Sequence, residues 1–540
     1  MRKQGDMENM NNKKRIRVLL VNPPTIEEIP ESFRGISYYT WLRTKNKFYD
    51  FVPGELLGAQ CIESYVQSHN HDCDFEILNA CVEEHTTVEQ TLQEIRNRMP
   101  LELVCFTGPY NVFHEVQYLA SQVKEEYPGT YVMYGQFFAS LCYEEILNKY
   151  KEFDFLNVGY GEITISKMIQ FLQAECVLED IPGLAYRDKE GNVVYNNEDG
   201  CCLDEIVDVK PTRNDIQKVI KSGLNVSIHC SRGCPYRCSF CATGTLMGKM
   251  GEHNNYRLRD PYEVVDEIEE IYNKYHINKI TFVDDTFAAN TVQGKEQAKI
   301  IAEEIIKRNI HLEIMIDTRI DCIDKELFTL LYQAGVHYVY IGIESANNQN
   351  LIEFNKGYKA DRINESLQIL EDIGIHAVYG FINFNPETTM EELKSNVELL
   401  KQLKYTDPTM YSHEFIPYPG IDMTNRLLKD GLITGEFPDY QNKYKHPEVY
   451  EVKMNYDRLL SKYTMFLFNM NKTPDFHVQE YQELNEKIYE LFSKYFEELV
   501  QTSIDKKNIA ELFNDYDAEL KAYLKQILIG ESNKKLNERQ

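Results

Sequence analysis

The stretch Ser231-Arg232-Gly233-Cys234-Pro235-Tyr236-Arg237-Cys238-Ser239-Phe240-Cys241 organises the chain. Its three cysteines have C-x3-C-x2-C spacing, and Gly233 and Pro235 favour an irregular loop. Thiolates bind soft metals such as iron, and three of them cannot complete the coordination of a four-iron cluster. One iron would stay open, as a catalytic metal site requires. Zinc and chance are the alternatives, but no second pair of Cys or His follows at zinc-finger distance.

Composition describes a globular, acidic protein. The chain has 540 residues, a net charge of -27, 26% charged and 43% hydrophobic residues, and room for two to four domains. The acidic balance disfavours a nucleic-acid partner. The sequence has no run of eighteen apolar residues, so we expect no membrane-spanning helix. Its N-terminal residues are polar and do not resemble a secretory signal. Thirteen cysteines then indicate reduced thiols in the cytoplasm.

After a tail over residues 1–15, strand and helix patterns alternate through residues 16–165. They predict a doubly wound, Rossmann-like α/β domain with strands near 16–22, 75–78, 103–107, 131–135 and 155–158. Ligands of such sheets bind where the strands end. The candidate binding residues there are Asn22, Thr107, Gly108, Tyr110, Gly135 and Gln136.

Residues 166–222 are predicted to form a linker that contains a hairpin with a glycine turn. A second α/β run over residues 223–436 has expected strands near 225–229, 279–283, 311–316, 336–342, 376–382 and 409–415. Six strand-helix units indicate a partial (β/α)6 barrel of the TIM type, with the cysteine loop after its first strand. Helical spacing of apolar residues predicts a helical C-terminal domain over residues 437–540.

The cysteine stretch, with Phe240 before its last cysteine, resembles the signature of the radical SAM (S-adenosylmethionine) superfamily. The resemblance implies that Cys234, Cys238 and Cys241 hold a [4Fe-4S] cluster. It also implies that the open iron binds SAM, which is cleaved on reduction to a 5'-deoxyadenosyl radical. An external electron donor of the flavodoxin or ferredoxin type is then expected.

Polar side chains stand at the other strand ends of the predicted barrel. Acids suit the ammonium and hydroxyl groups of SAM, and arginine suits its carboxylate. The candidate SAM-binding residues are Phe240, Asp284, Asp285, Arg319, Glu344 and Ser345. The motifs around Asp284, Glu344 and Pro417 resemble those of cobalamin-linked radical SAM enzymes.

The first domain resembles the cobalamin-binding domain of those enzymes in Leu19–Pro24 and in the D-x4-G-x-G-E pattern from Asp154 to Glu162. It lacks the D-x-H-x-x-G motif that supplies a histidine ligand to cobalt. Phe137 and Phe138 replace smaller family residues and could either pack against a corrin or fill its place. Bound cobalamin and a vestigial domain therefore both stay open.

The resemblance implies a cobalamin-dependent radical SAM enzyme, with methyl transfer to an unactivated carbon through the adenosyl radical and methylcobalamin as the leading interpretation. A rearrangement, cyclisation or oxidation is the first alternative, and a non-enzymatic cobalamin or iron-sulfur sensor is the second. The sequence names no substrate and assigns no catalytic side chain.

Overall fold

The computed structural model describes residues 14–24, 55–80, 87–196, 203–221, 224–250, 256–403, 408–472, 479–505 and 507–537. The chain forms two compact units. The first comprises Met1–Val339, Ile369–His376 and Tyr418–Asp422, and the second comprises Tyr340–Gln368, Ala377–Pro417 and Met423–Gln540. Strands β13 (Val336–Glu344) and β14 (His376–Phe381) each begin in the first unit and end in the second.

A seven-stranded sheet of order β2-β1-β3-β4-β5-β6-β7 opens the first unit. The neighbours from β2 to β5 are parallel, which confirms the α/β architecture predicted for this region. β6 and β7 extend the sheet by antiparallel pairing. The strands are β1 (Ile16–Asn22), β2 (Cys73–Asn79), β3 (Leu103–Phe106), β4 (Tyr131–Tyr134), β5 (Phe155–Asn157), β6 (Leu184–Arg187) and β7 (Val193–Tyr195).

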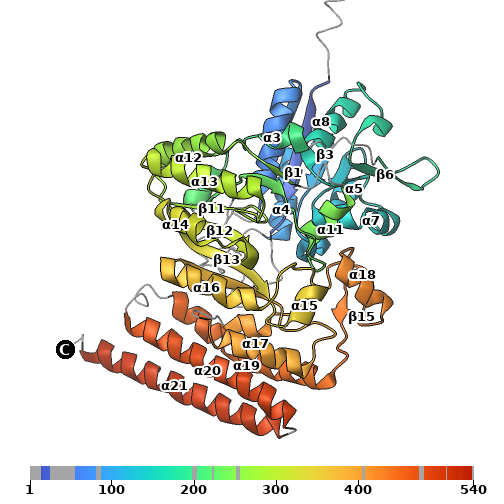
Figure 1. The fold of residues 1–540 in the computed structure, drawn as a ribbon. Helices are drawn as coiled ribbons and strands as arrows, with labels where there is room; N and C mark the ends of the chain where they lie inside the picture. Colours follow the sequence, from blue (N-terminus) through green and yellow to red (C-terminus); the bar gives the residue numbers. More distant parts are fainter. Residues whose placement is uncertain are drawn as a thin grey trace, which may run out of the picture. The chain divides into compact units, whose positions relative to one another are not determined.

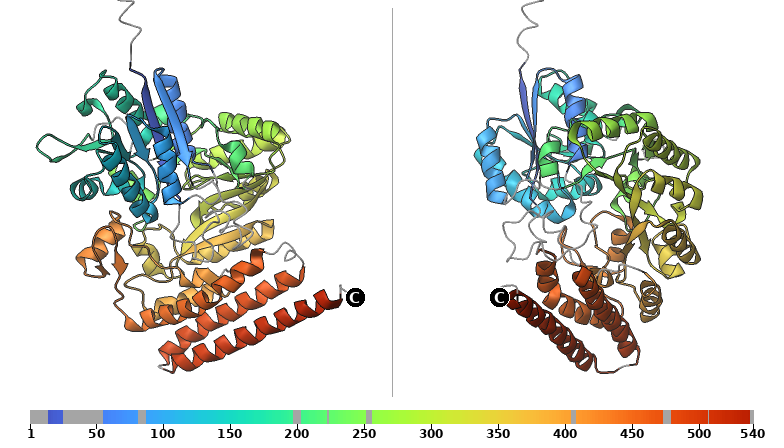
Figure 2. Two further views of the ribbon diagram at one scale, coloured as in Figure 1. Left: turned by 180° about the vertical axis from the view of Figure 1, so that it is seen from behind. Right: turned by 90° about the vertical axis from the view of Figure 1, so that its left-hand side faces the viewer.

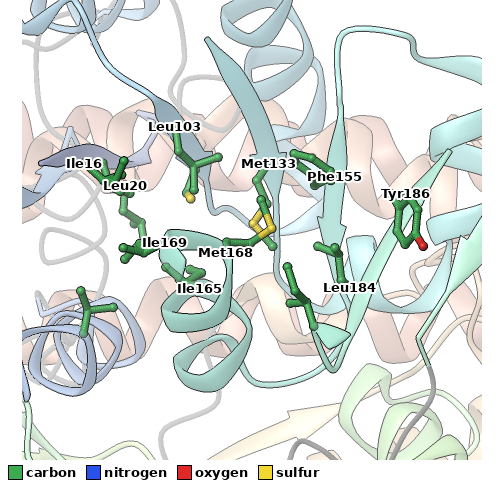
Figure 3. Close-up of a cluster of buried hydrophobic side chains, with 14 of the residues drawn as sticks. Ile16, Leu20, Leu103, Met133, Phe155, Ile165, Met168, Ile169, Leu184 and Tyr186 are labelled. Carbon is green, nitrogen blue, oxygen red and sulfur yellow. The ribbon is translucent and has the colours of Figure 1, made fainter. Parts of the chain in front are cut away.

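Helices alternate with these strands and bury apolar side chains against them. Figure 3 shows Met168 and Ile169 of α8 packed with Leu103 and Leu184 of the sheet in one hydrophobic cluster. Thr87 caps α4 through a capping box with Gln90, which explains where that helix begins. The helices are α3 (Leu57–His69), α4 (Val88–Arg98), η4 (Tyr110–Val112), α5 (Phe113–Glu126), α6 (Phe137–Leu141), α7 (Tyr143–Lys149), α8 (Gly161–Leu172) and η5 (Leu178–Asp180).

The hairpin predicted as part of a linker belongs to this sheet. Leu184 and Ala185 of β6 are fully buried, and Tyr186 is 6% exposed. A free linker hairpin would expose one face, whereas these side chains complete the core below α8. The polypeptide that crosses to the second sheet is therefore shorter than predicted, and it carries α9 (Leu203–Ile206) and α10 (Ile216–Lys221).

A second sheet has the order β14-β13-β12-β11-β8, and β11 is parallel to both β8 and β12. The remaining strands are β8 (Val226–Ile228), β11 (Lys279–Phe282) and β12 (Glu313–Arg319). The helices that follow them along the chain are α12 (Pro261–Tyr275), α13 (Val292–Lys307), η7 (Ile320–Cys322), α14 (Lys325–Gln333) and α16 (Asp361–Ile373). Helices α12, α13 and α14 lie in a row beside β11 and β12 (Figure 1). This arrangement confirms the parallel radical SAM type of sheet.

The sixth predicted strand, 409–415, is wrong. The segment instead contains a 3-10 helix, η8 (Pro408–Ser412), and keeps only an isolated parallel bridge between Glu414 and Phe384. Pro408 has no backbone N–H for a ladder bond and has a fixed φ, so it favours the start of a helical turn. The barrel is consequently five strands and a bridge.

Buried charges join the two sheets of the first unit. Arg213 donates to Glu55 at 2.6 Å and to Glu267 at 2.7 Å, and Arg259 donates to Glu267 at 2.8 Å. Glu55 also accepts from the backbone N–H of Ser227 in β8 at 2.8 Å. Burial alone would raise the pKa of Glu267, but the two guanidinium groups lower it below its usual range. The network therefore holds a charged carboxylate inside the unit.

The second unit ends in long helices, as predicted. Figures 1 and 2 show α19 (Pro447–Lys472), α20 (Gln479–Ile504) and α21 (Ile509–Asn537) side by side. Tyr456 of α19 is fully buried and donates to the Pro408 carbonyl at 2.8 Å. The second unit also contains α15 (Asn348–Glu353), α17 (Met390–Leu400), α18 (Asp422–Lys429), β15 (Ile433–Thr434) and β16 (Gln441–Asn442). No helix of the described part combines the length and apolar character needed to cross a bilayer.

Candidate functional site

The cysteine loop starts from a short strand. Part of the stretch predicted as irregular, Ser231–Gly233, forms β9 and pairs antiparallel with β10 (Tyr256–Leu258). Gly233 then takes a φ of 75°, a conformation that favours glycine, and releases the chain into the loop that carries the cysteines. Cys234 and Cys238 are buried, and Cys241 and Phe240 are half-buried.

The loop is closed by α11 (Ala242–Lys249), a helix that the sequence analysis missed. A Cβ at Gly244 would lie 2.9 Å from the Cys238 carbonyl oxygen and 3.0 Å from the Cys238 nitrogen. Only glycine allows α11 to approach the loop so closely, which is the signal that could have revealed this helix. The first turn of α11 therefore holds the backbone of Cys238 in place.

The three thiols have the chemistry that a cluster needs. Cys241 interacts electrostatically with both Cys234 and Cys238, so the three lie near one another. Burial raises the pKa of Cys234 to about 12, and metal binding must therefore release protons. Among the described residues, no three His, Cys, Asp or Glu side chains converge on a single-ion site. A four-iron cluster does not require that, because three of its irons would each take one protein thiolate.

Acidic side chains follow β11 and lie near the end of β12, beside this loop. Asp284 is 3% exposed and accepts from the backbone N–H groups of Cys230 at 3.0 Å and of Ser231 at 2.5 Å. Asp285 accepts from Thr243 of α11 at 2.9 Å, and burial raises its pKa to about 6. Burial, with both acids nearby, raises the pKa of Asp317 to about 7. Asp284 thus braces the cysteine loop, and its predicted contact with SAM stays a prediction.

Arg319 is directed at the cysteine loop. Its Nη1 donates to the Cys238 Sγ at 3.3 Å, and its Nε donates to Asp321 at 2.9 Å. Its guanidinium carbon lies 3.7 Å from the centre of the Tyr236 ring. Arg319 therefore contacts Cys238, one of the three cysteines predicted to hold the cluster, and its predicted contact with the SAM carboxylate stays a prediction.

Glu344 and Ser345 belong to the second unit. Glu344 has a φ of 68°, in the left-handed region that non-glycine residues rarely adopt, and such strain is concentrated at functional sites. Its carboxylate pairs with the buried Lys356 at 3.2 Å, and a Cβ at Gly342 would overlap it. Ser345 donates to Asn396 at 3.2 Å. Gly342 and Lys356 therefore fix the position of Glu344, and the predicted contact of Glu344 and Ser345 with SAM stays a prediction.

A cavity of about 490 Å³ opens inside the first unit. Strand-end residues of the first sheet line it, among them Thr107, Gly135 and Gln136, and their predicted contact with a cofactor stays a prediction. Thr243 and Asp285, next to the cysteine loop, line the same cavity. Residues from both predicted cofactor regions therefore face one chamber.

The two phenylalanines at the end of β4 separate in the structure. Phe138 is fully buried and packs edge-on against Phe113 at 4.9 Å, whereas Phe137 lines the cavity. Gln136, with a φ of 101°, turns the chain at this point and accepts from the Phe137 N–H at 2.7 Å. Phe138 thus leaves the chamber open, and Phe137 can pack against a flat ligand.

Three other predicted residues contact their neighbours beside this chamber and are not among its lining residues. Asn22 donates to Asn79 at 3.0 Å, and Tyr110 packs with Tyr418 at 5.1 Å between ring centres. The Gly108 carbonyl accepts from Tyr134 at 3.0 Å. Their predicted contact with a cofactor stays a prediction.

The cysteine loop, the strand-end acids and the chamber together define the class of protein. Residues 228–400 match the family model of the radical SAM superfamily, so the chain contains a radical SAM domain. A radical SAM domain implies a [4Fe-4S] cluster and SAM, and the three cysteines of the loop are suitable ligands for such a cluster.

The chain is similar to several proteins whose names refer to cobalamin, S-adenosylmethionine or methyl transfer. The structure of the cobalamin-dependent S-adenosylmethionine radical enzyme OxsB, with aqua-cobalamin and S-adenosylmethionine bound, has a TM-score of 0.74 at 16% identity and covers 95% of this chain and 80% of that chain. An uncharacterized methyltransferase, PH0819, of Pyrococcus horikoshii is 24% identical over 71% of this chain and 80% of its own length. The anaerobic magnesium-protoporphyrin IX monomethyl ester cyclase of Synechocystis sp. is 27% identical over 61% of this chain and 65% of its own length.

Proposed function

We propose that the chain is a cobalamin-dependent radical SAM methyltransferase that acts on an unactivated carbon. The observation that carries the proposal is the shared chamber, lined by Gly135 and Gln136 of the first sheet and by Thr243 and Asp285 beside the cysteine loop. When bound, the cluster, SAM and cobalamin would supply a 5'-deoxyadenosyl radical and a transferable methyl group. The fold shared with OxsB supports the assignment of cobalamin.

The chain's own residues would bind and orient these groups. Cys234, Cys238 and Cys241 would hold the cluster and leave one iron open, while Asp284 fixes the backbone that precedes them. The strand ends around Gln136 would receive the corrin without a histidine ligand. Apolar lining residues such as Leu246 and Met247 of α11 would exclude water from the chamber, which protects a radical from side reactions.

A cyclisation, rearrangement or oxidation is the second candidate reaction. The similarity to the magnesium-protoporphyrin ester cyclase favours it, because that relative is named for ring closure. Both candidates use the same cluster loop and chamber. A sensor without turnover is disfavoured by the radical SAM domain itself.

The proposal includes a reductant and a cellular location. Cleavage of SAM at the cluster needs one electron from outside the chain, and we expect a flavodoxin or ferredoxin to deliver it. The thiols of Cys61, Cys105, Cys142 and Cys230 are buried and free, which suits the reducing cytoplasm.

Two measurements test the proposal. Anaerobically reconstituted protein should bind four irons and cleave SAM, and the triple replacement of Cys234, Cys238 and Cys241 by Ala should lose both. Wild-type protein supplied with hydroxocobalamin should retain about one cobalt through gel filtration. Its absorbance spectrum should be that of a cobalamin without a histidine ligand. Loss of all cobalt on the column would remove the methyl-transfer mechanism.

The reaction type is decided by isotopes. Deuterium from the SAM methyl group should appear in the product, and deuterium from the substrate carbon should appear in 5'-deoxyadenosine. Retained cobalamin with neither transfer would favour the second candidate.

A further inference from the structure

Arg232 lines the chamber and has two buried donor nitrogens without a hydrogen-bond partner in the described part of the protein. Its side chain is only 8% exposed and lies between Glu162, whose oxygen is 2.6 Å from Nη1, and the Tyr160 ring, 5.6 Å from the guanidinium carbon. Its Nε and Nη2 are buried and have no hydrogen-bond partner within the described part of the protein. These two nitrogens form one edge of the guanidinium, which can bind a single acceptor group with two N–H donors.

The position of Arg232 indicates where a partner must come from. Arg232, Glu162 and Tyr160 all line the chamber. A buried donor without a partner costs about 1–3 kcal/mol, and more for a charged group. The ion pair with Glu162 involves only Nη1, so it leaves the buried Nε and Nη2 without a partner. An acceptor that enters the chamber would recover this free energy.

The charges of the chamber select the kind of acceptor. Glu162 already neutralises Arg232, and Glu55 and Asp285 also line the chamber. A second anion would therefore meet acidic walls rather than a positive field. A neutral carbonyl oxygen suits the edge better, and the amide nitrogen of a carboxamide could donate to the acidic side chains.

We propose that the Nε–Nη2 edge of Arg232 binds a carboxamide oxygen on the rim of cobalamin. The corrin ring carries several acetamide and propionamide side chains, and Arg232 lies in the same chamber as the strand ends of the first sheet. This inference rests on the proposed function. In this arrangement Arg232 is a positioning residue, because it precedes Gly233 at the start of the cysteine loop and would hold the corrin next to that loop.

The test compares Arg232→Lys with Arg259→Lys. Both arginines are buried and paired with a glutamate, but Arg259 does not line the chamber. Lysine keeps the charge and loses the two-donor edge. The dissociation constant of hydroxocobalamin is measured by absorbance titration, with iron content, SAM affinity and thermal unfolding as companions.

The Arg232→Lys protein should bind hydroxocobalamin about tenfold to a hundredfold more weakly, the loss expected for charge-assisted hydrogen bonds. Its iron content and SAM affinity should stay at wild-type values, and Arg259→Lys should bind cobalamin normally. Arg232→Gln is the second variant, should the lysine fail to fold. Wild-type cobalamin affinity in a folded Arg232 variant would overturn the inference and leave a structural ion pair. Failure of the wild-type protein to bind cobalamin would instead refute the proposed function, and this inference with it.

Discussion

Replacement of Arg319 should change the reduction potential of the cluster before it changes anything else. The guanidinium donates to the Sγ of Cys238 at 3.3 Å and is held there by Asp321 at 2.9 Å and by the ring of Tyr236. Reduction adds negative charge to a cluster and its thiolates, so a donor to a ligand sulfur stabilises the reduced state more than the oxidised state. Arg319→Met removes both the donor and its charge.

The size of the effect follows from the hydrogen bond. A hydrogen bond to a charged group contributes about 1.5–3 kcal/mol. If about half of this is realised only on reduction, the potential should fall by about 30–60 mV, since about 59 mV corresponds to 1.4 kcal/mol for one electron. Arg319→Lys keeps a positive charge and should show a smaller decrease.

The assay is a redox titration of the reconstituted cluster without SAM, followed by electron paramagnetic resonance. A separate titration of SAM affinity tests the other role of Arg319, for which loss of the SAM carboxylate contact should cost about 1–3 kcal/mol. An unchanged potential in Arg319→Met with four irons bound would refute the contact to Cys238 as a tuning interaction. An unchanged SAM affinity would refute only the SAM contact.

Three further predictions concern single positions. Gly244→Ala should lower the iron content at least severalfold, because the new methyl group would lie 2.9 Å from the Cys238 carbonyl; full iron content on reconstitution would contradict this. Gly342→Ala should displace the Glu344 carboxylate and weaken SAM binding roughly tenfold, the loss of one charge-assisted contact, whereas an equal affinity would show that Glu344 does not touch SAM. Burial raises the pKa of Asp317 to about 7, so the folded protein binds a proton that the unfolded chain releases, and the free energy of unfolding should decrease as pH rises from about 4 to about 7. In urea titrations, Asp317→Asn should reduce the change in the free energy of unfolding between about pH 4 and about pH 7 by about 1–3 kcal/mol. An unchanged pH dependence in the variant would exclude Asp317 as its source.

Local patterns in the sequence predicted most of the elements. Apolar runs of β-branched residues marked the buried strands, and the spacing of Cys234, Cys238 and Cys241 predicted a metal-binding loop. The segment 409–415 has the same β-forming composition, but Pro408 and the turn after it favour a 3-10 helix. A short apolar run does not record whether a neighbouring strand is available to pair with it.

Contacts between distant residues could not be predicted. Position at a strand end brought Arg319 to the site, but sequence does not record that its side chain turns toward Cys238, 81 residues earlier. The pair of Arg232 with Glu162 joins two motifs that were each recognised alone. The packing of both sheets decides which residue pairs with a buried charge. This packing cannot be deduced from a single sequence.

The buried charges around Arg213 also govern how the chain can be assembled and recombined. During synthesis, Glu55 leaves the ribosome 172 residues before Ser227, and its other partner, Arg213, also follows much later. Until both have emerged, the first sheet must either keep that carboxylate in water or bury it unpaired, which is strongly unfavourable. The first sheet is therefore not a freestanding cassette. An exchange of the first sheet between related proteins, in evolution or by engineering, must therefore include the matching Arg213 and Glu267.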